Sequence, residues 1–138
     1  MLIKAFIIAY KAHRGQKDKA GKAYILHPVF VAMHTKGIKR KTVALLHDVV
    51  EDTEITFDDL KRKGFDDEIV RAVQAITKIK GENYQDYLQR VKQNTIAKDV
   101  KLADLKHNSD LHRIKRVTES DIIRNQKYQA AILYLSTA

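Results

Sequence analysis

The sequence has no cysteine and no tryptophan, only one proline and five glycines, and no hydrophobic run long enough to cross a bilayer. Without cysteine, neither a disulfide framework nor a thiolate metal site can form, so any transition metal must be bound by histidine and carboxylate side chains. Such ligands favour manganese, iron, magnesium or zinc. The single proline, Pro28, suits the first turn of a helix, where its missing N–H costs no hydrogen bond.

Composition limits the size and class of the protein more than its function. A chain of 138 residues fits one domain with one core, and a hydrophobic share of 44% is enough to fill that core. Lysine and arginine outnumber the acids by 26 to 17, which favours a polyanionic partner such as nucleic acid, a phosphorylated metabolite or an acidic surface. Composition does not choose among these partners.

Residues 1–10 are apolar, but they lack the basic start and the small-residue cleavage site of a signal peptide. They predict an amphipathic helix, and we expect a cytoplasmic protein with no membrane partner. Apolar residues recur at helical spacing along the rest of the chain, and no strand pattern occurs. We therefore expect one all-α domain over residues 1–138, with helices near 2–13, 28–37, 39–52, 57–63, 65–78, 84–91, 96–111 and from 120 onward.

Residues 44–53, ALLHDVVEDT, place five polar and potentially reactive side chains in a short, otherwise apolar stretch. In a continuous helix, His47 and Glu51 lie on one face, as do Asp48 and Asp52. An imidazole beside a carboxylate predicts a divalent metal site, and two acids one turn later could handle protons or an attacking water. Each residue alone also fits a helix end with solvated acids, but the group favours chemistry.

His27 precedes the helix expected from Pro28, and a single histidine there is most often a capping or packing residue. Its place one helix before His47 makes it a candidate metal ligand. The loop of residues 14–22 has two glycines and four basic side chains. It fits a solvated basic turn, or a flexible loop that grips phosphate.

Asp104 and Asn108 lie four residues apart on a largely apolar helix. A buried carboxylate must be paired or must bind a cation, because an isolated buried charge is costly. Lys101 or Lys106 could supply the pair. We favour a metal site that Asp104 completes together with the histidine and Asp48 ligands. His107 and His112 are left as supporting or surface residues.

These segments together resemble the HD superfamily of metal-dependent phosphohydrolases, and more narrowly the hydrolase domain of the RelA/SpoT family and its stand-alone small alarmone hydrolases. The resemblance rests on HRGQ at 13–16 with Lys19 and Gly21, YILHP at 24–28, ALLHDVVEDT at 44–53, KLAD at 101–104 and HN at 107–108. The blocks follow one another in the family's order over nearly the whole chain.

The resemblance implies an HD-domain helical bundle that binds Mn²⁺. It implies removal of the 3′-pyrophosphate from guanosine tetra- or pentaphosphate, giving GDP or GTP and pyrophosphate. The implied metal ligands are His27, His47, Asp48 and Asp104, the residues that orient and activate water are Glu51 and Asp52, and the substrate contacts are Arg14, Lys19, Asn108 and Tyr128. Synthesis of the alarmone is not expected from so short a chain, and the oligomeric state is left open.

The chain departs from the family pattern at two places. Asp18 stands where the family usually has an arginine that helps to hold the guanine base, and residues 105–106 read LK where the family usually has RL. The first departure leaves open an HD phosphohydrolase for another nucleotide, such as the 2′-phosphate of NADPH. A basic nucleic-acid-binding helical protein and a degenerate HD domain that binds nucleotide without cleaving it are the remaining alternatives.

Overall fold

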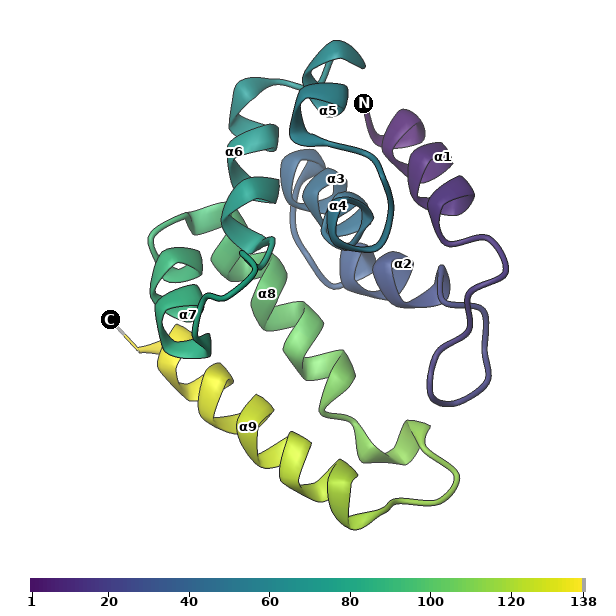
Figure 1. Ribbon diagram of the computed structural model, residues 1–138, viewed down its shortest axis with the longest axis vertical. Helices are drawn as coiled ribbons and strands as arrows, with labels where there is room; N and C mark the ends of the chain where they lie inside the picture. Colours follow the sequence, from purple (N-terminus) through teal and green to yellow (C-terminus); the bar gives the residue numbers. More distant parts are fainter. Residues whose placement is uncertain (138) are drawn as a thin grey trace.

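The computed structural model describes residues 1–137 and is built almost entirely of helices (Figure 1). Within these residues no strand forms beyond one isolated bridge between Lys17 and Ala23, which confirms the predicted all-α class. The helices are α1 Leu2–Ala12, α2 Leu26–Met33, α3 Ile38–Leu46, α4 Val49–Asp52, α5 Phe57–Arg62, α6 Asp67–Ile76, α7 Tyr84–Lys92, α8 Thr95–Asn108, the 3₁₀ turn η1 Leu111–Arg113, and α9 Glu119–Ser136.

Helices α3 and α8 form the centre of the bundle. Helix α3 packs against α1, α2, α6 and α8, and α8 packs against α2, α6, α7 and α9. Their inward side chains, such as Val43, Leu46, Val100 and Leu105, are almost completely buried. Figure 1 shows that α9 lies alongside α8, on the side of the bundle far from α1. Residues at the ends and inner faces of α3 and α8 are therefore held by the core. No helix within residues 1–137 is both long and apolar enough to span a membrane.

The helix expected over residues 39–52 is broken, so that prediction was wrong in its extent. Helix α3 ends at Leu46, and His47 and Asp48 form a turn before the short helix α4. The ring Nδ1–H of His47 donates to the carbonyl oxygen of Ala44, which in a continuous helix would accept from the backbone N–H of Asp48. The side chain thus takes the acceptor that the helix needs, and the break turns His47 and Asp48 inward.

The starts of α2 and α9 also differ from the prediction, as does that of α6, which begins at Asp67 rather than at residue 65. Helix α2 begins at Leu26, so His27 lies inside its first turn rather than before it, and Pro28 remains in the first turn where its missing N–H is tolerated. Helix α9 is capped by Thr118 rather than Ser120. The Thr118 hydroxyl accepts from the Asp121 N–H at 3.3 Å, and the Asp121 carboxylate accepts from the Thr118 N–H at 2.9 Å.

The basic loop before α2 is folded back on itself. The backbone N–H of Asp18 donates to the Lys22 carbonyl, and the N–H of Tyr24 donates to the Gln16 carbonyl, both at 2.8 Å. Gly21 makes the turn with a φ of 81°, a conformation that glycine adopts without strain. The loop is therefore a tight hairpin that carries Lys19 at its tip and leads directly into α2.

Candidate metal centre

Helix α2, the turn after α3, and helix α8 bring His27, His47 and Asp104 to one buried point. One potential ligand atom from each lies within 4.8 Å of the others. The Nε2 atom of His27 is 2.7 Å from Oδ1 of Asp104, and Nε2 of His47 is 3.3 Å from the same oxygen. All three residues are at most 4% exposed. Two imidazoles and one carboxylate thus meet at a point shielded from bulk solvent. This set of donor atoms suits a divalent cation.

Asp48 lies beside this group. Its Oδ2 atom is 3.2 Å from Nε2 of His47. The hydroxyl group of Tyr24 donates a hydrogen bond to the same carboxylate oxygen. The structure therefore places all four residues of the predicted ligand set together. It adds Tyr24, which belonged to the YILHP motif but had no predicted role, because nothing in the sequence pairs it with Asp48.

The orientation of the two histidines fits metal binding. The Nδ1–H of His47 is donated to Ala44, so its Nε2 faces the carboxylates as a lone pair when the ring is neutral. Nδ1 of His27 is 2.7 Å from Nδ1 of His107. Burial and the positive charges of Arg113 and His27 lower the pKa of His107 to about 4. A neutral His107 can accept a hydrogen bond from the Nδ1–H of His27, which leaves the Nε2 atom of His27 free to bind a cation.

Asp104 is paired with a lysine, and its position also allows it to bind a cation. One oxygen faces the imidazoles, and the other lies 3.0 Å from Nζ of Lys101, while the side-chain amide of Asn108 donates to Oδ1 at 3.2 Å. Burial alone would raise the pKa of Asp104, but Lys101 and the two histidines hold it well below its usual value. The pairing lysine is Lys101; Lys106 is exposed.

The metal affinity of this centre is expected to rise with pH. Burial would lower the pKa of His47, but the Asp48 and Asp104 carboxylates outweigh it and raise the pKa to about 9. Since a metal binds only the unprotonated ring, the apparent Mn²⁺ affinity should rise by up to about tenfold per pH unit below pH 9. In the metal-free protein the sign is opposite. The protonated ring stabilises the fold fully below pH 6.5, and this contribution is lost as pH rises through 9.

Calorimetric titration with Mn²⁺ at several pH values, in buffers of different ionisation enthalpy, measures both the affinity and the proton release. We expect about one proton to be released per metal at neutral pH. An affinity that does not change with pH, together with no proton release, would show that His47 is not a ligand.

Glu51 and Asp52, the two predicted catalytic acids, lie at the rim of the centre on α4 and stay accessible to solvent. Oε1 of Glu51 accepts from the backbone N–H of Lys78 at 3.0 Å. Partial burial and the negative charge of Asp48 raise the pKa of both acids. A carboxylate with a raised pKa, next to a cation site, is suited to accept a proton from water.

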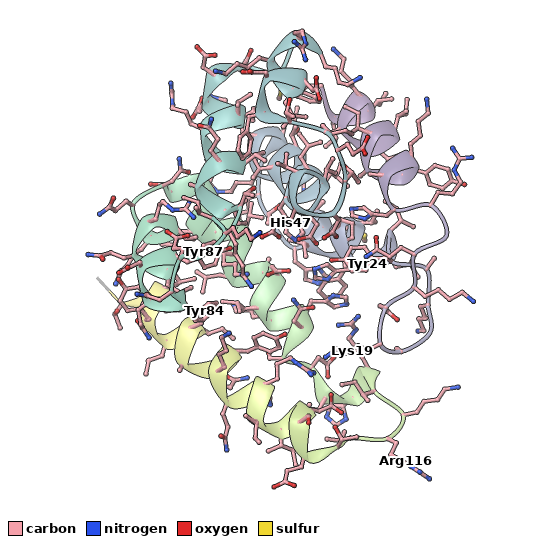
Figure 2. The ribbon with its side chains drawn as sticks, in the orientation of Figure 1. Lys19, Tyr24, His47, Tyr84, Tyr87 and Arg116 are labelled. Atoms are coloured by element: carbon pink, nitrogen blue, oxygen red, sulfur yellow. The ribbon has the colours of Figure 1, made fainter. Side chains whose placement is uncertain are left out.

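A cluster of lysines that sequence reasoning missed lies on the α7 side of the centre. We define this lysine cluster as Lys78, Lys101 and Lys127. The Nζ atom of Lys127 is 4.0 Å from the ring centroid of Tyr84, and that of Lys101 is 5.4 Å from the centroid of Tyr87. Burial and the other two positive charges lower the pKa of Lys78. Figure 2 shows Tyr84 and Tyr87 on this side of His47, with Tyr24 and Lys19 on the other.

Arg90 holds the segment that carries Lys78. Its guanidinium group donates to the carbonyl oxygens of Gln74, Ala75 and Thr77, each at 2.9 Å, and forms an ion pair with Glu82 at 2.8 Å. These carbonyls belong to the end of α6, where helical partners are missing. Arg90 therefore fixes the turn whose backbone N–H binds Glu51.

A cavity of about 250 Å³ adjoins the centre on the side of the hairpin. It lies between the hairpin, the end of α8, the residues around η1, and α9. Three predicted substrate contacts, Lys19, Asn108 and Tyr128, line it together with Tyr24. The fourth, Arg14, is exposed and lies outside the wall of the cavity as described for residues 1–137. Asn108 and Tyr24 connect the cavity to the centre, because they contact Asp104 and Asp48.

The chain has several relatives among curated proteins, and their names concern guanosine phosphates. The chain is 35% identical over 123 residues to a probable guanosine-3′,5′-bis(diphosphate) 3′-pyrophosphohydrolase of Synechocystis, covering 78% of this chain and 16% of that protein. It is 31% identical to a protein of Borreliella burgdorferi with the corresponding name, covering 99% of this chain and 21% of the relative. A GTP pyrophosphokinase of Streptomyces coelicolor is 39% identical over 76% of this chain and 14% of its own. The chain thus spans about a fifth or less of these relatives.

A solved structure shows the same fold. It is described as a metazoan ortholog of SpoT that hydrolyses ppGpp, and it superposes with a TM-score of 0.79 at 24% sequence identity, covering 97% of this chain and 84% of that one. The family model of the HD domain matches residues 5–134, which include every residue of the metal centre. On this match, and with a buried histidine–aspartate cluster at its core, the chain belongs to the HD domain family.

Proposed function

We propose that residues 1–138 act as a single HD-type hydrolase domain that removes the 3′-pyrophosphate from guanosine tetra- or pentaphosphate. The products are pyrophosphate and GDP or GTP. The observation that carries the reaction class is the convergence of His27, His47 and Asp104 beside Asp48, with an acid of raised pKa at the rim. The names of the curated relatives support the choice of substrate.

The cation belongs to the group formed by His27, His47, Asp48 and Asp104, and we propose Mn²⁺ because imidazole and carboxylate ligands without thiolate suit it. When bound, this ion supplies Lewis acidity, which draws electron density from phosphoryl oxygens and lowers the pKa of water. The side chains of the protein contribute the remaining functions: proton transfer, orientation of the substrate and neutralisation of phosphate charge.

Hydrolysis breaks the bond between phosphorus and the ribose 3′-oxygen and forms a bond from phosphorus to the oxygen of water. A proton must leave that water, and the 3′-oxygen must leave as a hydroxyl group. We assign the proton from water to Glu51, which is held in place by the Lys78 backbone N–H. Glu51 is exposed, so it passes this proton to solvent, and the departing 3′-oxygen takes one proton from solvent in return. Asp52 lies beside Glu51 and orients the water. The lysine cluster neutralises the charge of the 3′-pyrophosphoryl group that is attacked, and Lys19 faces the other phosphates from the hairpin.

A panel of nucleotides tests this proposal. We expect Mn²⁺-dependent release of pyrophosphate from guanosine tetraphosphate, no release with a chelator, and little release from nucleoside triphosphates. Release of inorganic phosphate from NADPH instead would keep the metal centre and change the substrate. Salt-sensitive binding of DNA or RNA without any turnover would contradict the proposal and support the nucleic-acid alternative.

A further inference from the structure

An ion pair joins the two rims of the cavity beside the metal centre. Nη2 of Arg113 is 3.2 Å from Oδ2 of Asp18, although the two residues are 95 positions apart in the chain. Nη1 of Arg113 donates to the carbonyl oxygen of His107 at 2.9 Å. Both Asp18 and Arg113 line the cavity. The Arg113 side chain is therefore held on the wall of the cavity by two contacts, with Asp18 and with the His107 carbonyl oxygen.

Both oxygens of the Asp18 carboxylate already have partners within the protein. Its Oδ1 accepts from the backbone N–H groups of Ala20 at 2.9 Å and Lys22 at 3.0 Å, which closes the hairpin turn, and its Oδ2 faces Arg113. A carboxylate with these three partners has little acceptor capacity left for a ligand. Asp18 thus acts on a ligand through Arg113 rather than by direct contact.

Arg113 retains the capacity to bind a ligand. A guanidinium group has five N–H donors in one plane, and only part of this set is used by His107 and Asp18. The side chain remains about a quarter exposed, at 26%. Because the group is already held, little conformational entropy is lost when it binds. It offers the cavity a flat cationic face and free donors at its edge.

The remaining walls suit a planar ring. Tyr24, Tyr128, Leu111 and Ile114 supply aromatic and aliphatic surface, and Asn108 supplies an amide. The volume of about 250 Å³ lies below the range of roughly 300–1,000 Å³ typical of whole small-molecule sites. The cavity therefore fits one part of a nucleotide, and its contact with the metal centre through Asn108 and Tyr24 places that part next to the reacting phosphate.

We infer that Arg113, positioned by Asp18, recognises the nucleobase of the substrate in this cavity and favours guanine over adenine. The guanidinium fork can donate to two acceptors at once, and the guanine edge presents O6 and N7 as such a pair, whereas adenine presents a donor at the corresponding position. This inference rests on the proposed function in one respect: it takes the phosphate groups of the substrate to lie at the metal centre.

Replacing Arg113 by alanine tests the inference. For guanosine tetraphosphate, KM should rise by about 10- to 100-fold while kcat changes by less than about threefold, because the lost contact binds the base in ground state and transition state alike. The preference for the guanosine substrate over its adenosine analogue, measured as the ratio of kcat/KM values, should fall toward one. Arg113→Lys should not restore this ratio, since an ammonium group lacks the planar fork.

Arg116→Ala is the matched control. Arg116 lies on the same segment, is exposed, and projects away from the cavity (Figure 2). Its replacement removes the same charge and should leave both KM and base preference unchanged. Asp18→Asn keeps an oxygen for the hairpin N–H groups and weakens the hold on Arg113. It should raise KM less than Arg113→Ala does, and it should have no added effect in the double variant.

The outcomes separate this inference from the proposed function. Unchanged KM and base preference in Arg113→Ala, with active wild-type enzyme, would overturn the inference and leave the hydrolase proposal standing. If the wild-type enzyme hydrolyses no nucleotide, the hydrolase proposal fails, and calorimetric binding of GDP decides the inference alone. A drop in GDP affinity of about tenfold or more in the folded Arg113→Ala or Arg113→Lys variant would support it, and equal affinities would overturn it.

Discussion

Replacing Asp104 by alanine is expected to remove the bound divalent metal and the hydrolytic activity together. It should also lower the free energy of unfolding by about 3–5 kcal/mol, the usual effect of breaking a buried ion pair from one side. The Asp104 carboxylate faces both imidazoles with one oxygen and Lys101 with the other. Without it, the largely buried ammonium group of Lys101 would lose its counter-charge. Metal analysis, turnover and urea denaturation measure the three effects.

Two variants separate the loss of metal from the loss of stability. Asp104→Asn keeps the shape and one oxygen acceptor but removes the charge, so metal and activity should fall while more of the stability is retained. Asp99→Ala on the same helix breaks an ion pair with Arg40 at 2.7 Å that is partly exposed, and it should change neither metal content nor turnover. Full metal occupancy and activity in Asp104→Ala would exclude the centre described above.

Replacing Glu51 by glutamine is expected to leave metal content unchanged and to slow turnover by about 10²- to 10⁴-fold, the usual contribution of a general base. The amide keeps the size of the side chain and an oxygen for the Lys78 N–H, which now donates to Oε1 at 3.0 Å. It cannot accept a proton from water. Single-turnover measurements with saturating Mn²⁺ isolate this chemical step from metal binding.

The pH profile gives a second readout for Glu51. Because partial burial and Asp48 raise its pKa, the wild-type rate should increase with pH as this carboxyl group loses its proton, and the Glu51→Gln profile should lack that limb. Glu54→Gln, a nearby exposed position, is the control and should behave as the wild type. A Glu51→Gln enzyme with unchanged turnover would place the proton acceptor elsewhere, and loss of metal would make Glu51 a ligand.

The fold class could be predicted because helical periodicity runs through the chain. Helix α5, for example, begins at residue 57 as expected, where Thr56 and Asp59 form a capping box. The break after Leu46 could not be predicted from that pattern. It depends on one side chain, His47, reaching the Ala44 carbonyl, and on the contact between Asp48 and Tyr24 from a different part of the chain. Local periodicity contains neither contact.

The candidate metal centre could be predicted from the sequence because its candidate ligands lie in short motifs with metal-binding residue types. The lysine cluster and the ion pair that surround this centre could not be predicted in the same way. The lysine cluster gathers side chains from α8, α9 and the turn after α6, and the Asp18–Arg113 pair joins residues 95 positions apart. Asp18 was visible only as a departure from the family pattern. Its role as the partner of Arg113 depends on how η1 packs against the hairpin.

The net charge of +9 gains a more specific meaning once its location is known. Lys78, Lys101 and Lys127 lie on one side of the metal centre, and Lys19 lines the cavity on the other. Positive charge on both sides of a buried donor set suits a small ligand with phosphate groups at both ends. A nucleic-acid surface instead needs a basic patch or stripe along one exposed face.

The most direct test of the central claim is to locate the metal. Diffraction data collected on both sides of the manganese absorption edge, from crystals grown with Mn²⁺, show where the ion binds. We expect one strong anomalous peak enclosed by His27, His47, Asp48 and Asp104, and its absence in His47→Ala crystals. A protein that releases pyrophosphate in the presence of Mn²⁺ but shows its anomalous peak away from these four side chains would contradict the account.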